Sequence, residues 1–504
     1  MTQPTFRVKH LQLDTFREHV IVIHERTVRE GNLGFNPLDR VTIFGTTAEG
    51  TRTEITGVLN FCRDNLVGAD EIGLSEQAFA DLALPEGAQV NATLAVAPRS
   101  VDLVREKLKG ARLNRDQFGA VLADIVAHRY SRVELAMFVL SCALKSLDAD
   151  ELADYTRAMI ATGTTLNFGE RLVADKHCVG GVPGNRTTLV LVPILAALGL
   201  TVPKTSSRAI TSPAGTADTM EMFAEVALTP ERLQEVVKHV GGCIVWGGAL
   251  GLAPADDILI TVERPMEIDT EAQMVASILA KKKSAGASHV LIDIPVGHTA
   301  KVRTDAEGEH LAELFRTVAA RVDLHVDVLL TRAGGPIGLG IGPRLEALDV
   351  LAVLRGEAHA PIDLRQKSLF LAARILEMSQ AVQPGEGYRT AVRVLDSGKA
   401  FEVFERIVSA QGPKQMPPAV ACVGIVNATS DGRIAEIDCW EIARVAKRAG
   451  APANPAAGVR LIRTVGDVVS RGEPLYEIHA STEAQLGFAR TYTDTHPQIV
   501  RFGF

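Results

Sequence analysis

The sequence predicts a multi-domain α/β protein, and three observations favour that fold class. The chain has 504 residues, enough for two to four domains at about 100–200 residues each. Residues 1–97 carry short strand-like runs, whereas residues 101–163 carry apolar side chains at helical spacing. Residues 171–300 then alternate strand-like and helix-like segments, which indicates an α/β sheet covered by helices.

The first segment, residues 1–97, is expected to form a small β-rich domain. Strand-like runs stand at residues 19–24, 39–44 and 88–96, and turn signals such as Asn36-Pro37 separate them. The pattern leaves a barrel and a sandwich open. No catalytic constellation is evident there, so we expect a role in assembly or packing.

Three further domains are expected along the chain. Residues 98–165 should form a helical domain, to which a later segment near 265–285 contributes. Residues 166–410 should form an α/β domain with a mixed sheet, and residues 411–504 a C-terminal α/β domain.

Within the α/β domain, strands are expected at residues 171–174, 200–203 and 290–294. Ligands of such sheets sit beyond the carboxyl ends of the strands. Polar residues follow each of these strands, so we expect them to meet in one site. The glycine-rich segment 334–343 either touches a ligand or is a plain connection.

The composition excludes several classes of protein. A net charge of −7 argues against a nucleic-acid partner. The six cysteines lack paired short spacings, so we expect neither a disulfide framework nor a zinc site, and a cytoplasmic location. The N-terminus does not resemble a secretory signal, and no apolar run approaches the ~18 residues of a membrane span.

A glycine loop at residues 176–186 is the first candidate for ligand binding. Gly180, Gly181 and Gly184 lack side chains, so backbone N–H groups can approach an oxyanion. The apolar run 187–198 has helical length, and its N-terminus would attract an anion. The spacing fits neither the P-loop nor the G-x-G-x-x-G motif, and a plain tight turn remains the alternative.

A second donor-rich segment follows about one helix later. Its cations, Lys204 and Arg208, flank a series of hydroxyl groups. The hydroxyl residues are Thr205, Ser206, Ser207, Thr211 and Ser212. Together with Lys176 and Arg186 of the glycine loop, this segment predicts one crevice with two anionic or polar groups.

A third segment supplies a carboxyl group and another lysine. Asp269 stands just before an amphipathic helix that begins at Glu271. Ser277 and Lys281 are four residues apart, so they share one face of that helix. Asp269 either caps the helix or transfers a proton to a leaving group. The neighbouring lysines, residues 281–283, are either ligand-facing or a solvated helix face.

Three motifs resemble the thymidine phosphorylase family. They are Asp-Lys-His-Cys-Val-Gly-Gly at 175–181, the segment 206–216, and Ala-Ser-Ile-Leu-Ala-Lys-Lys at 276–282. The resemblance runs from about residue 100 to the C-terminus. The longer match at 207–218 and the additional N-terminal domain are similar to the AMP phosphorylase branch.

This resemblance implies phosphorolysis, in which inorganic phosphate attacks C1′ and releases the free base and a sugar 1-phosphate. For AMP the product is ribose 1,5-bisphosphate, and for thymidine it is 2-deoxyribose 1-phosphate. The family also implies no cofactor besides phosphate as co-substrate, no metal, a homodimer or larger homo-oligomer, and a hammerhead-like C-terminal α/β domain.

The resemblance also implies the site residues. Phosphate contacts are expected from Lys176, Cys178, Thr188, Ser206 and Thr216. Nucleotide contacts are expected from Gly181, Ser207, Arg208, Ala209, Ile210, Thr211, Ser212, Thr216, Ser277, Lys281 and Lys301. Asp269 is the expected proton donor, and His177 is the second catalytic candidate.

The chain departs from the family pattern at several positions. Cys178 replaces the usual serine, and a thiol is a weaker hydrogen-bond donor than a hydroxyl. Val262 replaces an arginine of the thymidine branch, and Ser212-Pro213-Ala214 replaces its His-Thr-Gly. Gly251 replaces a usual aspartate, with no evident consequence.

Four functions remain open on the sequence. AMP phosphorylase is the first, and thymidine phosphorylase is its nearest alternative. A phosphoribosyltransferase would use Mg²⁺ through Asp256-Asp257 together with phosphoribosyl pyrophosphate. A non-catalytic nucleotide-binding scaffold is the fourth.

Overall fold

The structure is a computed structural model that describes residues 4–15, 18–145, 147–169, 171–209, 212–268 and 270–503. The chain divides into two compact units. The first comprises Met1–Gly163 and Ala253–Ser277, and the second comprises Thr164–Leu252 and Ile278–Phe504. No helix in the described part of the chain is long and apolar enough to cross a membrane.

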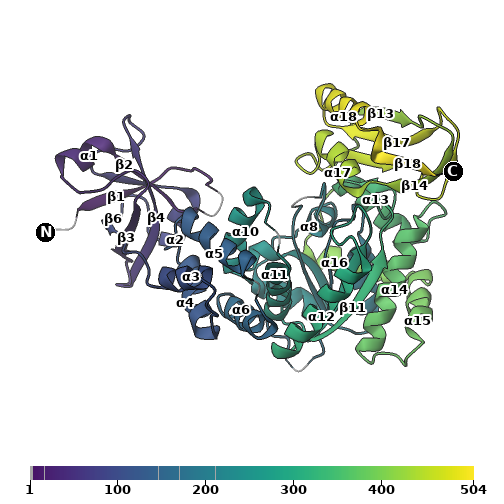
Figure 1. Cartoon of the computed structure of the whole chain (residues 1–504), viewed down its shortest axis with the longest axis horizontal. Coiled ribbons are helices and arrows are strands. Elements are labelled where there is room, and N and C mark those ends of the chain that lie inside the picture. The colour runs from purple at the N-terminus through teal and green to yellow at the C-terminus, as the bar shows by residue number, and fades with distance from the viewer. Residues whose placement is uncertain are drawn as a thin grey trace. The chain divides into compact units, whose positions relative to one another are not determined.

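The N-terminal strands of the first unit close into a barrel, so the barrel alternative holds (Figure 1). Its order is β1-β5-β2-β4-β3-β6, and β6 returns to pair with β1. Apolar side chains of alternating residues, such as Ile21, Ile23 and Ile43, fill the interior. The elements are β1 (Thr5–His10), β2 (Val20–His24), α1 (Glu25–Glu30), β3 (Arg40–Thr46), β4 (Arg52–Cys62), β5 (Glu71–Leu74), α2 (Glu76–Leu82) and β6 (Gln89–Leu94).

A helical bundle completes the first unit. Side-chain caps at Asn114, Ser131 and Asp148 set the starts of three of its helices. Phe118 and Phe138 pack against the ring of Tyr155 in its core. The helices are α3 (Ser100–Leu108), α4 (Arg115–Val126), α5 (Arg132–Leu144), α6 (Ala149–Ala161), α10 (Pro254–Met266) and α11 (Glu271–Ser284), the last continuing into the second unit.

Parallel strands form the centre of the second unit. β11, β10 and β7 pair in that order, β8 pairs with β9, and a bridge between Val173 and Thr201 links the two groups. The strands are β7 (Ala174–Cys178), β8 (Val202–Ser206), β9 (Gly242–Trp246), β10 (His289–Val296) and β11 (His325–Arg332). The helices are α7 (Thr187–Ala197), α8 (Thr216–Met220), α9 (Pro230–Val240), η1 (Gly247–Ala249), α12 (Asp305–Arg321), α13 (Pro343–Arg355), α14 (Ile362–Met378), α15 (Gly387–Asp396) and α16 (Lys399–Gln411).

Two of the central strands lie further along the chain than the sequence predicted. The expected strands at 171–174 and 200–203 are observed at Ala174–Cys178 and Val202–Ser206. Lys176 and Lys204 therefore lie within strands rather than after them. Both ammonium groups lie near buried carboxylates, so a charged residue here does not end the strand.

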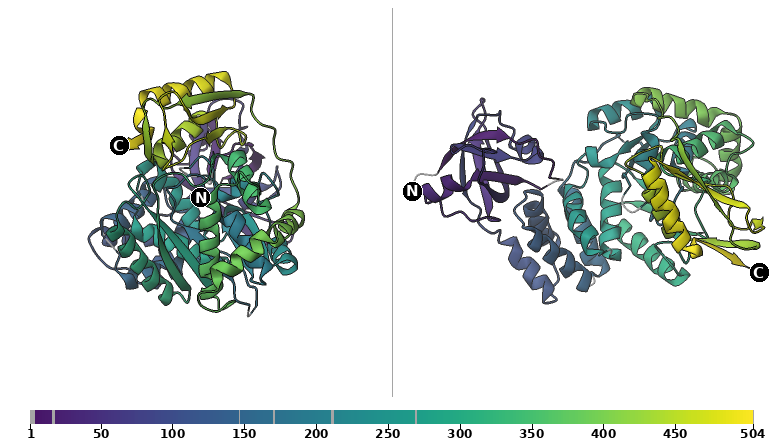
Figure 2. Two further views of the ribbon diagram at one scale, coloured as in Figure 1. Left: turned by 90° about the vertical axis from the view of Figure 1, so that its right-hand side faces the viewer. Right: turned by 90° about the horizontal axis from the view of Figure 1, so that it is seen from above.

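Antiparallel strands form two small sheets at the C-terminal end of the second unit. A four-stranded sheet has the order β12-β15-β17-β13, and a three-stranded sheet has the order β16-β14-β18. Helix α18 lies along the C-terminal strands (Figure 2). The elements are β12 (Gly340–Ile341), β13 (Cys422–Asn427), β14 (Gly432–Ile437), α17 (Cys439–Arg448), β15 (Gly458–Leu461), β16 (Val468–Val469), β17 (Pro474–Ala480), α18 (Glu483–Thr495), η2 (Pro497–Ile499) and β18 (Val500–Gly503).

A buried ion pair joins two helices of the bundle. Lys107 Nζ of α3 donates to Glu151 Oε1 of α6 at 2.6 Å, and both side chains are only 3% exposed. The backbone N–H of Leu113 donates to the same oxygen at 2.8 Å. The Glu151 carboxylate therefore satisfies two donors, one of them charged.

The substitution Glu151→Ala should destabilise the bundle by ~3–5 kcal/mol, because it leaves the Lys107 ammonium buried without its partner. Glu106→Ala, which removes the exposed partner of Lys109, should change stability by no more than ~0.5 kcal/mol. Urea unfolding followed by hydrogen exchange of α3 and α6 measures both. Equal effects of the two substitutions would contradict the role of the pair.

Candidate active site

Buried lysine and aspartate side chains occupy the central strands of the second unit. Lys282 Nζ lies 2.7 Å from Asp175 Oδ2, and Lys204 Nζ lies 3.4 Å from Asp175 Oδ1. All three residues are at most 4% exposed. Burial alone would raise the pKa of Asp175, but the two ammonium groups hold it below its ordinary value. Burial lowers the pKa of Lys204 to about 7.

The next residue of β7 starts a second charged group, since successive side chains of a strand point to opposite faces. Lys176 Nζ donates to Thr187 Oγ1 at 3.2 Å and lies 3.6 Å from Asp293 Oδ2. Lys367 Nζ of α14 lies 3.0 Å from the same oxygen. The hydroxyl of Thr331 donates to Asp293 Oδ1 at 2.7 Å.

These two groups carry an excess of positive charge. We define the buried lysine cluster as Lys176, Lys204, Lys282, Lys367, Asp175 and Asp293. Its four amino groups outnumber its two carboxylates, although every member is largely removed from water. Unbalanced buried charge is costly, and an anion bound beside the cluster would offset that cost. The cluster is therefore suited to bind an anion.

Two titratable side chains accompany the cluster on β7. Burial and the surrounding lysines lower the pKa of His177 well below its ordinary value, so its imidazole is neutral at pH 7. Burial and the Asp293 carboxylate raise the pKa of Cys178, so its thiol stays protonated. Asn185 Nδ2 lies 3.3 Å from Cys178 Sγ. Both residues can thus offer neutral polar groups to a ligand.

Glycines of the first loop allow close backbone approaches. Gly181 has φ +86°, and a Cβ there would lie 2.5 Å from the backbone nitrogen of Lys301. Gly184 has φ +72°, and a Cβ there would lie 2.2 Å from the carbonyl oxygen of Ile337. Only glycine fits either position. The glycine-rich segment 334–343 thus packs against this loop through Ile337.

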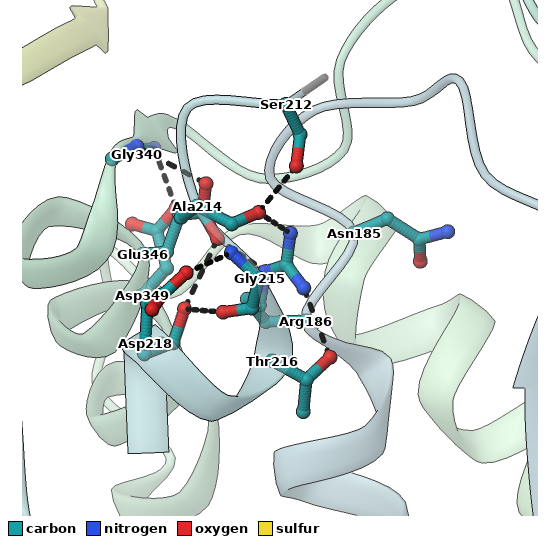
Figure 3. A network of polar contacts seen from close by, with 12 residues as sticks. Asn185, Arg186, Ser212, Ala214, Gly215, Thr216, Asp218, Gly340, Glu346 and Asp349 are labelled. Atoms are coloured by element: carbon teal, nitrogen blue, oxygen red, sulfur yellow. Dashed lines mark hydrogen bonds and ion pairs between the residues drawn. The ribbon is translucent and has the colours of Figure 1, made fainter. Parts of the chain in front are cut away.

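A buried arginine joins the first loop to the second (Figure 3). Arg186 Nη1 donates to Thr216 Oγ1 at 2.9 Å, and Nη2 donates to the carbonyl oxygen of Ala214 at 2.9 Å. Its Nε pairs with Glu346, which is fully buried. Burial raises the pKa of Glu346, although Arg186 opposes that shift. The two donor-rich loops are therefore direct neighbours.

An aspartate organises the second loop from within (Figure 3). Asp218 Oδ2 accepts the backbone N–H groups of Ala209 at 2.6 Å and Gly215 at 2.8 Å. Arg208 Nη1 lies 3.1 Å from Asp218 Oδ1 and 2.5 Å from Glu221 Oε2. Its guanidinium also lies 5.0 Å from the centre of the Trp246 ring. Much of the charge on Arg208 is thus balanced within the protein.

The structure brings many predicted residues together in the second unit. Lys176, His177 and Cys178 lie on β7, and Thr188 lies in the first turn of α7. Ser206 ends β8, and Thr216 begins α8. Gly181 and Lys301 are adjacent. Ser207, Arg208, Ala209 and Ser212 belong to the second loop, and Lys281 lies on α11.

Other predicted residues are not placed with this group. Asp269, Ile210 and Thr211 lie outside the described residues, so the structure does not test their predicted roles. Ser277 belongs to the first unit, on the same helix as Lys281. The roles of all these residues stay predictions.

Two residues of the site, Glu346 and Lys367, stand in no motif of the sequence. Asp175 and Lys282 belong to the motifs at 175–181 and 276–282, and Asp293 belongs to the expected strand 290–294, but the sequence indicated no ion pair among them. Lys282 is 2% exposed, so the alternative of a solvated face fails for this residue. The position of Lys282 beside the apolar face of its helix was the signal that could have indicated its burial.

Family models match most of the chain. The helical bundle domain of the glycosyl transferase family matches residues 101–163, and the a/b domain of that family matches residues 170–401. The C-terminal domain of pyrimidine nucleoside phosphorylase matches residues 433–495.

Similar proteins cover nearly the whole chain. A protein of Methylococcus capsulatus named "Putative thymidine phosphorylase" is 46% identical over 492 residues, covering 97% of this chain and 94% of that protein. A Polaromonas protein of the same name is 46% identical over 500 residues, covering 99% and 97%. The fold also resembles anthranilate phosphoribosyltransferase of Thermus thermophilus, with TM-score 0.51, 21% identity, and coverage of 62% of this chain and 99% of that one.

The substitution Glu346→Ala should loosen the second loop, because Arg186 would lose its buried partner. We expect a loss of ~3–5 kcal/mol in stability and faster hydrogen exchange at residues 212–216. Glu357→Ala, at a part-exposed carboxylate 3.8 Å from Arg355, is the matched control and should change neither measurement. Unchanged exchange in Glu346→Ala would show that the loop does not depend on this pair.

Proposed function

Because this chain belongs to the thymidine and pyrimidine nucleoside phosphorylase family of pentosyltransferases, we propose that it cleaves a nucleoside 5′-monophosphate, AMP first, with inorganic phosphate. The products would be the free base and ribose 1,5-bisphosphate. Membership of the family makes the chain an enzyme of the nucleoside phosphorylase type. The nucleotide preference is the new element of the proposal.

The proposed step transfers the pentosyl group between two nucleophiles. A phosphate oxygen attacks C1′ while the bond from C1′ to the base nitrogen breaks. The electron pair of that bond goes to the base, which takes a proton from the Asp269 carboxyl group. C1′ gains positive charge in the transition state, so the neighbouring phosphate dianion stabilises it. No redox partner is needed for this balance.

The link between the two loops is the observation that carries this proposal. The bond from Arg186 to Thr216 holds the glycine loop beside the hydroxyl-rich loop. The buried lysine cluster supplies the positive charge for one phosphate. The backbone of Lys301, packed against Gly181, and the hydroxyl of Ser207 give a second set of donors. Inorganic phosphate would use the lysine cluster with either substrate. The 5′-phosphate of a nucleotide would use the second set of donors, which a nucleoside would leave unused.

Thymidine is the nearest alternative substrate. Its recognition in the family uses an arginine where this chain has Val262, which is only 7% exposed. An apolar side chain at that position cannot grip a pyrimidine carbonyl. In the second loop, Ser212 donates to the carbonyl oxygen of Ala214 at 2.7 Å, where that branch has His-Thr-Gly. Both features favour a nucleotide over thymidine.

Base release from a substrate panel tests the proposal. AMP, CMP, adenosine and thymidine are incubated with the full-length protein and phosphate, and free base is quantified by chromatography. We expect AMP to give the highest kcat/KM. Asp269→Asn, which cannot donate the proton, should slow release by at least ~100-fold while AMP still binds. Faster release from thymidine than from AMP would overturn the preference.

The same assay separates the other classes of function. Full activity in EDTA would exclude a phosphoribosyltransferase, which needs Mg²⁺. Thermal protection by AMP with no turnover of any substrate would indicate a binding scaffold.

Cys178→Ser should lower the KM for phosphate several-fold, because a hydroxyl is a better hydrogen-bond donor than the thiol. Cys178→Ala should raise that KM. Because the raised pKa keeps the thiol protonated, alkylation of Cys178 should be slower than that of an ordinary exposed cysteine at the same pH. Phosphate saturation curves and iodoacetamide kinetics measure these effects. Identical curves for Ser, Ala and Cys would remove residue 178 from the phosphate site.

A further inference from the structure

Three potential metal ligands meet within the first unit, on elements far apart in the sequence. His19 precedes β2 of the barrel, Asp81 lies in α2, and His128 lies between α4 and α5 of the bundle. One ligand atom from each residue lies within 4.8 Å of the other two. None of these residues belongs to the candidate active site.

The imidazole of His19 is oriented by a second contact. Its Nδ1 lies 3.1 Å from the carbonyl oxygen of Thr56, which only accepts hydrogen bonds. Nδ1 therefore carries a proton, and the other nitrogen, Nε2, faces Asp81 Oδ2 at 2.8 Å. A histidine whose first nitrogen donates to a backbone carbonyl while the second faces outward is the usual arrangement of a metal ligand. His19 is 3% exposed, so this orientation is fixed by packing.

The contact between His19 Nε2 and Asp81 Oδ2 requires a positive charge between the two atoms. With Nδ1 protonated, a neutral His19 would turn a lone pair toward the carboxylate of Asp81. Either a second proton on His19 or a cation satisfies this contact.

His128 places a second imidazole beside this contact. Its ring stacks on that of His19, with centroids 3.9 Å apart and planes 28° apart. A metal ion can bind two neutral imidazole nitrogens at once, and one ligand nitrogen of each ring lies within 4.8 Å of the other. His128 has φ +52°, a conformation that few residues with side chains adopt. The backbone is thus held in an uncommon shape that brings the ring to this position.

We propose that His19, Asp81 and His128 bind one Zn²⁺ or a similar borderline divalent ion. Two imidazole nitrogens and one carboxylate oxygen are ligands that Zn²⁺ prefers. The Asp81 side chain is 59% exposed, which leaves room for water as the fourth ligand. Only side chains of this chain and solvent are involved. The proposal is independent of the proposed function.

The ion would tie the barrel to the helical bundle. Two other contacts mark the same region: Arg40 donates to the backbone carbonyl of His128, and Arg132 Nε lies 3.0 Å from Glu18 Oε2. Both contacts are polar, and a metal ion bound by His19, Asp81 and His128 would add a directional link between the barrel and the bundle. The ion would thus act on stability within the first unit rather than on the reaction.

Zinc binding to the full-length protein tests the proposal. Chelator-treated protein is titrated with ZnCl₂ against a chromophoric chelator, and CoCl₂ is added separately to observe ligand-field absorption. We expect one high-affinity equivalent per chain. Asp81→Asn and His128→Ala should each weaken it at least ~10-fold. His10→Ala is the matched control, because His10 Nε2 also faces a carboxylate of α2, Glu76, at 2.8 Å.

Each outcome decides the proposal. The proposal is supported if one equivalent of zinc binds to the unchanged protein and to His10→Ala but not to the other two variants. It is also supported if zinc raises the unfolding temperature of the unchanged protein and of His10→Ala alone. No zinc binding would leave the contact between His19 and Asp81 as a hydrogen bond alone. Zinc that survives both substitutions but is lost on thiol alkylation would belong to the free cysteines. Either result overturns the proposal, and because His128 and Asp81 are partly exposed, their variants should fold.

Discussion

Uncompensated buried charge is the constraint on which the second unit depends. Four lysines of the buried lysine cluster face only two aspartates, in a sheet whose neighbouring side chains are apolar. Burying such an excess is costly unless an anion joins it. The lowered pKa of Lys204 is one consequence of keeping these groups out of water. The protein thereby accepts a cost in stability that a bound phosphate would offset.

The glycine loop and the hydroxyl-rich loop are held beside each other by a buried arginine. Arg186 of the glycine loop donates to Thr216 of the hydroxyl-rich loop, and an ion pair with the buried Glu346 holds the guanidinium in place. The close approach of Gly181 to Lys301 brings a third segment to the same place. A site built this way keeps its donors aligned before the substrate arrives, and preorganised donors are the largest source of transition-state stabilisation in many enzymes.

The sequence predicted the fold class and the family, whereas several site residues had no visible signal. Strand-like runs indicated the β-rich start, helical spacing of apolar residues indicated the bundle, and the length and composition of an apolar run indicated α7. Asp293 and Lys367 are 74 positions apart and meet only through the fold of β10 and α14. His19, Asp81 and His128 escaped for the same reason, because their spacing matches no local ligand motif. The strands of Lys176 and Lys204 were displaced because a lysine more often follows a buried strand than lies within it. Pairwise contacts between distant elements cannot be inferred from one sequence.

Calorimetric titration of the full-length protein with inorganic phosphate shows whether the buried lysine cluster holds the anion. We expect one phosphate per chain, with the binding abolished by Lys176→Met and retained in Lys283→Met, whose amino group donates to the backbone carbonyl of the exposed residue Asp323. Binding of equal strength in both variants would contradict the claim that the buried lysine cluster holds the anion.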